Sequence, residues 1–381
     1  MIAQATIPGM DITLAQTLLG GLSPRTFMRR HWQKKPLLIR QAIPGIVSPL
    51  ERAQLFELAA RDDVESRLIV HHEGRWRLRQ GPFKRRSMPS LAQARWTLLV
   101  QGLDLHVDAA HQLLAKFRFV PDARLDDLMV SYATDGGGVG PHFDSYDVFL
   151  LQIMGRRRWR IGRLKDPALQ PAVPLKILAN FTAEQEWLLE PGDMLYLPPR
   201  WAHDGVAEGE CMTCSIGFRA PGRHQWGTDV LQRILDAAEA PDAEGLYRDP
   251  RQLATAEPAR IPDALNAFTA DAMTHLLADP RAVACALGEV LSDLKSSVWF
   301  DAGAALRHDA GVRLDRRTRM MYDRWHVFVN GESYRAAGRD SRLMQRLADH
   351  RALSATDAAA LSREALALLD QWAQAGWLHA A

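Results

Sequence analysis

The sequence has few cysteines, almost no net charge and no long apolar run. Its three cysteines, Cys211, Cys214 and Cys285, are too few and too odd in number for a disulfide framework, which favours a reducing compartment. The 47 Lys and Arg residues nearly balance the 45 Asp and Glu residues. The chain as a whole therefore lacks the basic excess of a dedicated nucleic-acid-binding protein. Because no run reaches about 18 uncharged apolar residues, we expect no membrane span.

The start of the chain, Met1–Ala5, has no basic segment leading into an apolar stretch, so the sequence predicts no secretory signal. These absences together predict a soluble, cytoplasmic protein. Apolar residues make up 47% of the chain, enough to build a core, which excludes a disordered protein. With domains of about 150 residues, the length predicts two or three domains.

The composition changes near residue 223. Before it, short runs rich in β-branched and aromatic residues alternate with Gly, Pro and Asp, a pattern typical of a sandwich or barrel of short strands. A tight turn is expected at Glu190–Asp193. The expected strands are Leu128–Ala133, Tyr146–Met154, Arg157–Ile161, Met194–Leu197 and Met212–Phe218.

Beyond residue 223, apolar residues recur at three- and four-residue spacing, which predicts helices. Trp325–Val329 followed by Asn330-Gly331 predicts a hairpin with a type I′ turn. The expected helices are Asp229–Glu239, Pro262–Ala278, Arg281–Lys295, Ser341–His350 and Thr356–Ala375. We therefore predict three domains: a β-rich domain at 1–223, a helical region at 224–300 and a small α+β, winged-helix-like domain at 301–381.

The most informative segment ends in His142-Phe143-Asp144. On a strand, His142 and Asp144 point to the same side, and they supply two of the three ligands of a facial triad for non-haem Fe(II). His203, which follows a predicted strand and a Pro-Pro turn, is the candidate third ligand. Glycines crowd the approach at Gly136–Gly140, as expected where backbone passes close to a ligand or another strand. The alternative is that these are packing or surface residues, as we expect of His71-His72, and of His106 and His111 on one helix.

Arg157 is a second candidate functional residue. Strand alternation puts Arg157, Trp159 and Ile161 on one face, and the latter two favour burial. An inward-facing arginine needs an anionic partner. The sequence leaves two partners open, a bound dicarboxylate and an internal Asp or Glu.

These segments together resemble the JmjC-type bacterial ribosomal oxygenases. The resemblance lies in Gly137–Ile161 (GGVGPHFDSYDVFLLQIMGRRRWRI), Glu190–His203 and Ser215–Pro221, and in the entry segment Phe27–Arg40. It implies a double-stranded β-helix, the jelly roll of JmjC and cupin proteins, at 1–223. It further implies a helical dimerisation region at 224–300 and a homodimer.

The resemblance also implies an oxidoreductase that uses Fe(II), 2-oxoglutarate and O2. His142, Asp144 and His203 fall on the family's metal positions, and these three are the predicted catalytic residues. Arg157 falls on the position that binds the far carboxylate of 2-oxoglutarate. Ser131 matches a pocket hydroxyl that contacts the cosubstrate or the substrate, and Ser215 is a weaker candidate of the same kind.

Members of this family hydroxylate side chains of large-subunit ribosomal proteins. The resemblance favours an arginine 3-hydroxylase acting on the protein beside the peptidyl-transferase centre. A guanidinium substrate needs a carboxylate at the mouth, for which Asp135 is the candidate, with Tyr132 beside it. The other interpretation of Asp135 is a turn-forming residue. A histidine hydroxylase, an N-methyl demethylase and a non-catalytic ribosome-binding module are the alternative functions.

Three further patterns are given structural explanations. Cys211 and Cys214 lack the second pair of a zinc site and would face opposite sides of a strand, so we expect packing residues. Gly136–Gly140 lacks the Lys-Ser/Thr of a phosphate-binding loop. The basic cluster at Arg75–Arg86 allows an RNA contact, although a solvated charged loop is the more common explanation of such a cluster.

Overall fold

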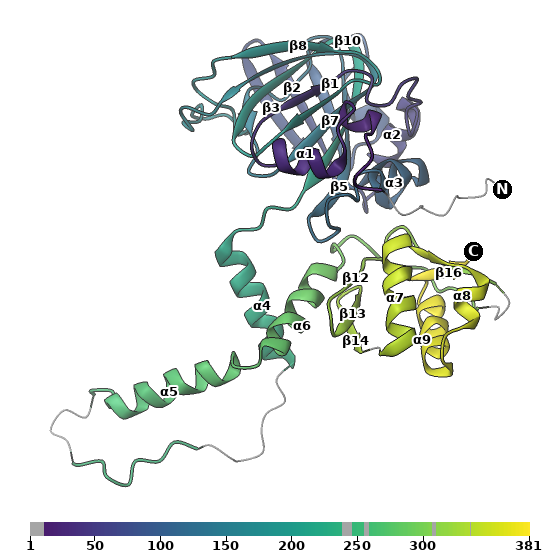
Figure 1. Cartoon of the computed structure of the whole chain (residues 1–381). Helices are drawn as coiled ribbons and strands as arrows, with labels where there is room; N and C mark the ends of the chain where they lie inside the picture. Colours follow the sequence, from purple (N-terminus) through teal and green to yellow (C-terminus); the bar gives the residue numbers. More distant parts are fainter. Residues whose placement is uncertain (1–10, 238–245, 255–258, 307–309, 336) are drawn as a thin grey trace.

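The computed structural model describes residues 11–237, 246–254, 259–306, 310–335 and 337–381, so Met1–Ala5 lies outside it. Its largest element is a ten-stranded antiparallel sheet wound into the jelly roll of the JmjC and cupin folds (Figure 1). The strands are β1 (Leu37–Ile39), β2 (Ser66–His72), β3 (Arg75–Gln80), β4 (Trp96–Val100), β5 (Leu125–Ala133), β6 (His142–Phe143), β7 (Val148–Arg163), β8 (Gln185–Leu189), β9 (Met194–Leu197) and β10 (Trp201–Phe218).

The two longest strands, β7 and β10, lie in the middle of this sheet and pair with each other along almost their whole length. The sequence predicted two strands, Tyr146–Met154 and Arg157–Ile161, where the structure has the single strand β7. The glycine between them does not end the strand. Gly155 adopts φ +62°, and a Cβ there would lie 2.0 Å from the carbonyl oxygen of Glu210, so glycine lets the strand bend and continue. The tight turn predicted at Glu190–Asp193 is present between β8 and β9.

One face of the sheet is covered by short helices from the first 120 residues. They are α1 (Pro24–Arg30), α2 (Arg52–Leu58) and α3 (Asp108–Ala115), with 3-10 turns at Thr17–Leu19, Arg85–Ser87 and Leu103–Leu105. The main core lies between these helices and the sheet, and it includes Phe27, Leu55 and Phe149. Cys214 points into this core, whereas Cys211 packs with Ala133 and Ala207 on the other face, so the opposite orientation predicted for the two cysteines is confirmed.

The interior of the jelly roll has its own smaller apolar cluster. It is built by Val148, Leu150, Trp159, Ile161, Leu189, Leu195 and Leu197. Alternate residues of β7 and β9 thus face the interior while their neighbours face the main core. The candidate site lies on this interior face.

Three helices follow the jelly roll: α4 (Arg223–Ala237), α5 (Asp263–Leu276) and α6 (Pro280–Ser292). All three were predicted, although α4 begins six residues before the expected Asp229. The expected last residues of that helix, Ala238 and Glu239, lie outside the described residues. Figure 1 shows α5 extending away from the other elements. In agreement, none of its residues is buried in a single chain.

The C-terminal unit combines two small sheets with helices. Its elements are β11 (Val312–Leu314), β12 (Met320–Tyr322), β13 (His326–Val329), β14 (Glu332–Arg335), α7 (Gly338–His350), β15 (Ala352–Leu353), α8 (Ala355–Ala359), α9 (Arg363–Gln374) and β16 (Leu378–Ala380). The predicted hairpin is confirmed, because β13 and β14 pair across Asn330 and Gly331, both with positive φ.

Two helix predictions were wrong in detail. Thr356–Ala375 is two helices, because the Ser362 side chain accepts a hydrogen bond from the Ala365 N–H and starts α9 afresh. His106 and His111 do not share a helix, since His106 ends a 3-10 turn before α3 begins. No helix among the described residues is long and apolar enough to cross a membrane.

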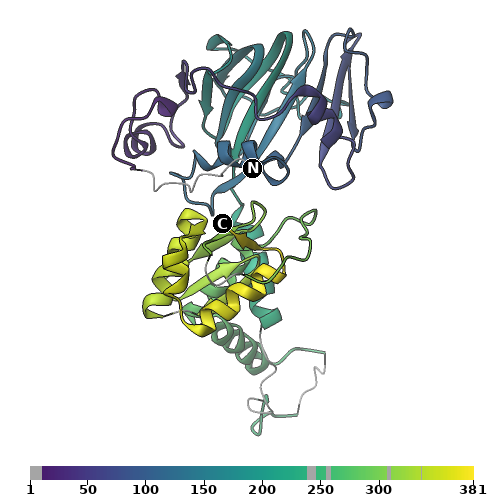
Figure 2. The ribbon, with the colours of Figure 1, turned by 90° about the vertical axis from the view of Figure 1, so that its right-hand side faces the viewer.

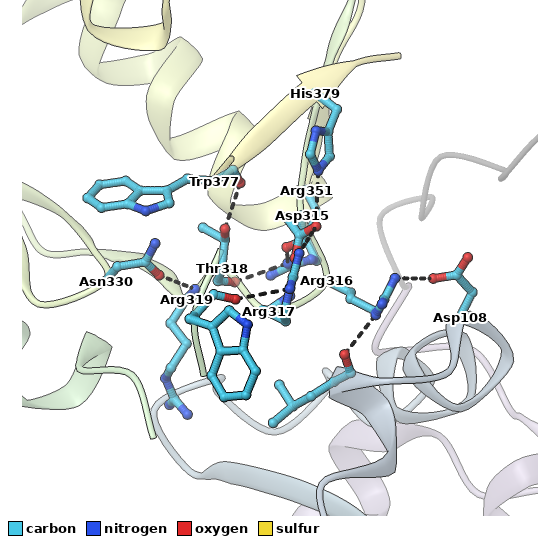
Figure 3. Close-up of polar contacts among 12 residues, drawn as sticks. Asp108, Asp315, Arg316, Arg317, Thr318, Arg319, Asn330, Arg351, Trp377 and His379 are labelled. Carbon is cyan, nitrogen blue, oxygen red and sulfur yellow. Dashed lines mark hydrogen bonds and ion pairs between the residues drawn. The ribbon is translucent and has the colours of Figure 1, made fainter. Parts of the chain in front are cut away.

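The C-terminal unit packs against the jelly roll (Figures 1 and 2). Arg118 forms a fork with Asp122 and donates to the carbonyl oxygens of Ala348 and Asp349 at 3.0 and 2.6 Å. In the opposite direction, Arg316 donates to the Leu105 carbonyl at 2.8 Å and to Asp108 at 3.0 Å (Figure 3). Each of the two units therefore contributes an arginine that binds the other unit.

Candidate metal and cosubstrate site

The structure brings His142, Asp144 and His203 together inside the jelly roll. His142 lies on β6, which pairs with β10 so that His142 stands opposite His203. Asp144 follows two residues after His142. One ligand atom from each residue lies within 4.8 Å of the others, and the centroids of the two imidazole rings are 4.2 Å apart. The sequence motif and the distant histidine thus form one cluster.

The backbone determines which nitrogen each histidine offers to the centre. His142 Nδ1 lies 2.9 Å from the carbonyl oxygen of Gly140, and His203 Nδ1 lies 3.0 Å from that of Trp201. A carbonyl oxygen only accepts, so Nδ1 carries a proton in both rings and Nε2 is the nitrogen left to bind a metal. This is the usual arrangement of metal-binding histidines, in which a hydrogen bond to the outer nitrogen orients the ring.

Burial also favours the neutral form of the inner histidine. His203 is 3% exposed, and its burial, with the nearby His142, lowers its pKa to about 4. Its Nε2 lies 3.7 Å from an Asp144 oxygen. Two neutral imidazoles and one carboxylate are the donor set of a facial triad, which leaves further coordination positions open. His142 and Asp144 are partly exposed, so the cluster is accessible from one side.

Arg157 faces the same interior, in agreement with the strand alternation. It is 4% exposed, and its Nη1 donates to Ser131 Oγ at 2.8 Å and to Thr213 Oγ1 at 3.3 Å. Its Nε is buried without a partner. Among the described residues no carboxylate forms an ion pair with Arg157, which excludes the internal Asp or Glu that the sequence left open.

Sequence reasoning missed two residues of this polar cluster. Thr213 accepts from Arg157 and donates through Oγ1 to Gln152 Oε1 at 2.8 Å. Both side chains are buried. A signal was available, because a glutamine inside the apolar run of β7 and a threonine on the strand opposite Ser131 are unexpected unless they serve an interior polar group.

Trp159 lies between Arg157 and the metal cluster. Its ring centroid is 5.4 Å from the Arg157 guanidinium carbon and 5.9 Å from the centroid of the His203 ring. The opposite residue on β10 is Gly205, where a Cβ would lie 2.6 Å from a Trp159 ring carbon. Glycine at this position therefore makes room for the indole that separates the two polar groups.

The other predicted site residues are placed differently. Ser215 lies on the same face of β10 as Thr213 but has no hydrogen bond to Arg157 within the described residues. Asp135 is exposed, and its Oδ1 accepts from the Gly209 N–H at 2.8 Å. Tyr132 is not part of the site, because it faces the main core and packs its ring on Phe56. Adjacent strand residues point to opposite faces, so Ser131 and Tyr132 cannot share one pocket.

Two other carboxylates near the motif, those of Asp147 and Asp204, already bind neighbouring side chains. Asp147 is fully buried and accepts from Tyr196 at 2.6 Å and from Gln33 at 3.0 Å. Asp204 pairs with Arg160. Both therefore have structural contacts away from the metal cluster.

Comparison with protein families gives two matches. A model described as a JmjC domain matches residues 112–226, which include the metal cluster and Arg157. A model described as a ROXA-like winged helix matches residues 261–379. The first match agrees with the jelly roll, and the second with the winged-helix character predicted for the C-terminal unit.

Curated proteins with similar sequences include bacterial oxygenases. The chain is 39% identical over 240 residues to the Escherichia coli "Ribosomal protein uL16 3-hydroxylase", and the match covers 62% of each chain. It is 40% identical over 204 residues to the Haemophilus influenzae "Probable ribosomal oxygenase", a match that covers 52% of this chain and 50% of that protein. In these alignments the chain thus spans less than two thirds of the length of either relative.

Solved structures match over a greater length. The crystal structure of E. coli ycfD has a TM-score of 0.82 at 30% identity, covering 93% of this chain and 97% of that one. A structure of the same protein, described as a ribosomal oxygenase in complex with cobalt and 2-oxoglutarate, has a TM-score of 0.78 at 29% identity and covers 98% of that chain. The likeness therefore extends through the jelly roll, the helices and the C-terminal unit.

The contact between Gly205 and Trp159 yields a first prediction. Gly205→Ala places a methyl group against the indole, so we expect a loss of stability of about 1–3 kcal/mol from overpacking, with a changed near-UV circular dichroism spectrum. Gly217→Ala on the same strand is the control, because its Cβ would come no closer than 3.6 Å to a neighbouring atom. Urea unfolding measures both. Equal stability of the two variants would contradict the contact.

Proposed function

Because the chain belongs to the JmjC-type bacterial ribosomal oxygenases, we propose that it is a 2-oxoglutarate-dependent dioxygenase that hydroxylates an arginine side chain of a large-subunit ribosomal protein. The observation that carries the proposal is the interior cluster of His142, Asp144 and His203, with Arg157 buried on the same face. A pure binding module has no need for two imidazoles held with Nε2 free.

The residues fit Fe(II) as the metal. His142 and His203 supply Nε2, Asp144 supplies a carboxylate oxygen, and the Gly140 and Trp201 carbonyls orient the two rings. When Fe(II), 2-oxoglutarate and O2 are bound together, they supply the oxidising power to hydroxylate an unactivated C–H bond. The protein's part is to hold these groups and to keep the reacting centre dry.

Arg157 fits the far carboxylate of 2-oxoglutarate. Its Nε is a buried donor without a partner, and a guanidinium binds a carboxylate through two parallel hydrogen bonds. Ser131 and Thr213 accept from Nη1 and hold the guanidinium in place, and Gln152 accepts from Thr213 in turn. We propose Ser215, on the same face as Thr213, as a weaker contact of the same cosubstrate.

The apolar residues of the interior complete the pocket. Leu150, Trp159, Ile161 and Leu195 are buried beside the polar cluster, and they exclude water from the reacting centre. In a water-excluded site the attraction between a guanidinium and a carboxylate is stronger than in bulk water. The pocket therefore favours an anionic cosubstrate at Arg157.

Asp135 is the proposed contact for the substrate guanidinium. Its Oδ1 is bound to the Gly209 N–H, and the side chain is exposed where β5 leaves the sheet. A carboxylate accepts more than one hydrogen bond, so it can still receive a guanidinium. The name of the E. coli relative as a uL16 3-hydroxylase supports a ribosomal protein as the substrate.

A histidine hydroxylase and an N-methyl demethylase remain the alternatives within this class. An Aedes aegypti relative, 27% identical over 236 residues, is named a bifunctional lysine-specific demethylase and histidyl-hydroxylase. The three activities share the metal and the cosubstrate and differ in the substrate contact. The exposed carboxylate of Asp135 favours a cationic guanidinium over a neutral imidazole.

We further propose that the chain forms a homodimer through its helical region and acts in the cytoplasm. Leu265, Phe268 and Leu276 lie along one side of helix α5. Each is 36–39% exposed in the single chain. Such a stripe on a helix that extends from the fold favours a protein partner. The division into a jelly roll at 1–223, a dimerisation region at 224–300 and a winged-helix-like domain at 301–381 is proposed with it.

Incubation with large-subunit ribosomal proteins, Fe(II) and 2-oxoglutarate under air tests the activity. We expect a 16 Da gain on one arginine-containing peptide, because one oxygen atom is inserted into a C–H bond; peptide mass spectrometry measures it. Asp144→Ala should abolish the gain. Asp62→Ala is the control, since Asp62 is exposed and far along the chain from the cluster. Release of formaldehyde without the gain would indicate the demethylase, and a gain on a histidine peptide the histidine hydroxylase.

Arg157→Gln tests the cosubstrate contact. Losing a charge-assisted bond worth about 1.5–3 kcal/mol should raise the KM for 2-oxoglutarate by about 10- to 150-fold while metal affinity stays unchanged. Arg156→Gln is the matched control, because Arg156 is the adjacent residue and faces outward. A similar KM for both variants in turnover assays would disprove the assignment.

Sedimentation equilibrium tests the dimer. We expect twice the 42.7 kDa of one chain for the unaltered protein and a monomer for Phe268→Glu, which puts a charge into the apolar stripe. Ala270→Glu, on the opposite side of α5, should remain dimeric. A monomeric unaltered protein would end the proposal.

A further inference from the structure

A cavity of about 100 Å³ lies at the boundary between the jelly roll and the C-terminal unit. Its walls come from both sides: Asp104, His111 and Arg118 from the jelly roll, and Arg316, Arg319 and Arg351 from the C-terminal unit. Lys295, after α6, closes a third side. No residue of the metal cluster lines it, so the cavity is separate from the proposed active site.

Most cations of this cavity already have a carboxylate partner. Arg118 is paired with Asp122, Arg316 with Asp108 and Arg317 with Asp315. Lys295 lies 3.3 Å from Asp126 and 3.5 Å from Asp127. The carboxylates of these pairs are therefore already bound to a cation.

Arg319 is the exception. Its backbone N–H donates to Asn330 Oδ1 at 2.9 Å, but its guanidinium has no hydrogen bond or ion pair with any described residue. Its Nε is buried without a partner, and no dashed contact reaches the guanidinium in Figure 3. Burial and the nearby Arg219 lower the pKa of Arg319 to about 10 against the weaker attraction of Asp126, Asp122 and Asp104, so the group is still charged at neutral pH. A buried charge without a partner is costly.

Two further groups in the cavity have no anionic partner within the part of the chain that the structure describes. Arg351 donates from Nη2 to the carbonyl oxygens of Asp315 and Thr318, at 2.7 and 3.0 Å, and to no carboxylate. His111 Nδ1 is buried without a partner, and burial together with Arg351 lowers the pKa of His111 to about 3. His111 therefore lines the cavity as a neutral imidazole whose Nδ1 has no hydrogen-bond partner in the described part of the chain.

One buried acid lines the cavity without forming an ion pair. Asp104 accepts from the Leu128 N–H at 2.9 Å, and burial next to Asp127 raises its pKa to about 7. It balances at most part of the charge of Arg319 and Arg351. The cavity thus keeps a buried guanidinium donor, Arg319 Nε, that lacks an acceptor among the described residues.

We propose that this cavity binds a small oxyanion, a phosphate or carboxylate group, with Arg319 as its principal contact. A guanidinium offers two parallel donors to either group. The volume is sufficient for a group of a few heavy atoms. Because the walls come from both units, the bound anion stabilises their packing against each other.

Isothermal titration calorimetry on the full-length protein tests the proposal, with inorganic phosphate and acetate as the two probes at constant ionic strength. We expect saturable binding of at least one probe. Arg319→Gln should weaken that binding at least tenfold, which is 1.4 kcal/mol. Arg342→Gln is the control, because Arg342 is exposed on α7 and does not line the cavity. The stronger probe identifies the preferred oxyanion.

Two further variants show whether the anion binds in this cavity or in the proposed active site, and keep the test valid if Arg319→Gln does not fold. Arg157→Gln removes the guanidinium inside the jelly roll and should leave the binding unchanged. If Arg319→Gln does not fold, Arg319→Lys replaces it, which keeps the charge but loses the fork and should also bind more weakly. No saturable binding of either probe, equal binding by the Arg319 variant, or loss of binding in Arg157→Gln would each overturn the proposal.

Discussion

The antiparallel pairing of β10 with its neighbours places each polar group of the proposed site. Along β10, His203 stands opposite His142, Gly205 opposite Trp159, and Thr213 opposite Ser131. Because the side chains of a strand alternate between two faces, a shift of one residue in this register would send the histidines into the main core. The register between β7 and β10 shifts next to Gly155, and the positive φ of this glycine lets β7 bend there and pair with β10 on both sides of the bend.

Burial gives this arrangement its chemical character. Inside the jelly roll burial lowers the pKa of His203, backbone carbonyls orient both imidazoles, and the neighbours of Arg157 are hydroxyls instead of a carboxylate. An interior that supplies one unpaired guanidinium and three metal-binding groups suits an anion that binds a metal at its other end. 2-Oxoglutarate has these two properties, because its keto acid end can bind a metal and its far carboxylate can bind a guanidinium. Among the described residues, a second buried guanidinium without an ion pair is that of Arg319, at the boundary of the C-terminal unit.

Sequence reasoning succeeded where one local rule was sufficient. Strand alternation placed Arg157 inside, and the Asn330-Gly331 pair identified its hairpin. It failed where tertiary contacts decide. The length of β7 depends on the close approach of Gly155 to Glu210, and the break before α9 depends on a single serine cap. Tyr132 was misplaced because the alternation rule was not applied to its neighbour Ser131.

The most direct test of the account is a crystal of the protein soaked with Co(II) and 2-oxoglutarate in the absence of air, measured at the cobalt absorption edge. We expect one strong anomalous peak within coordination distance of His142 Nε2, His203 Nε2 and an Asp144 carboxylate oxygen, with a dicarboxylate that extends from the metal to the Arg157 guanidinium. A metal bound elsewhere, or a dicarboxylate whose far end does not contact Arg157, would contradict it.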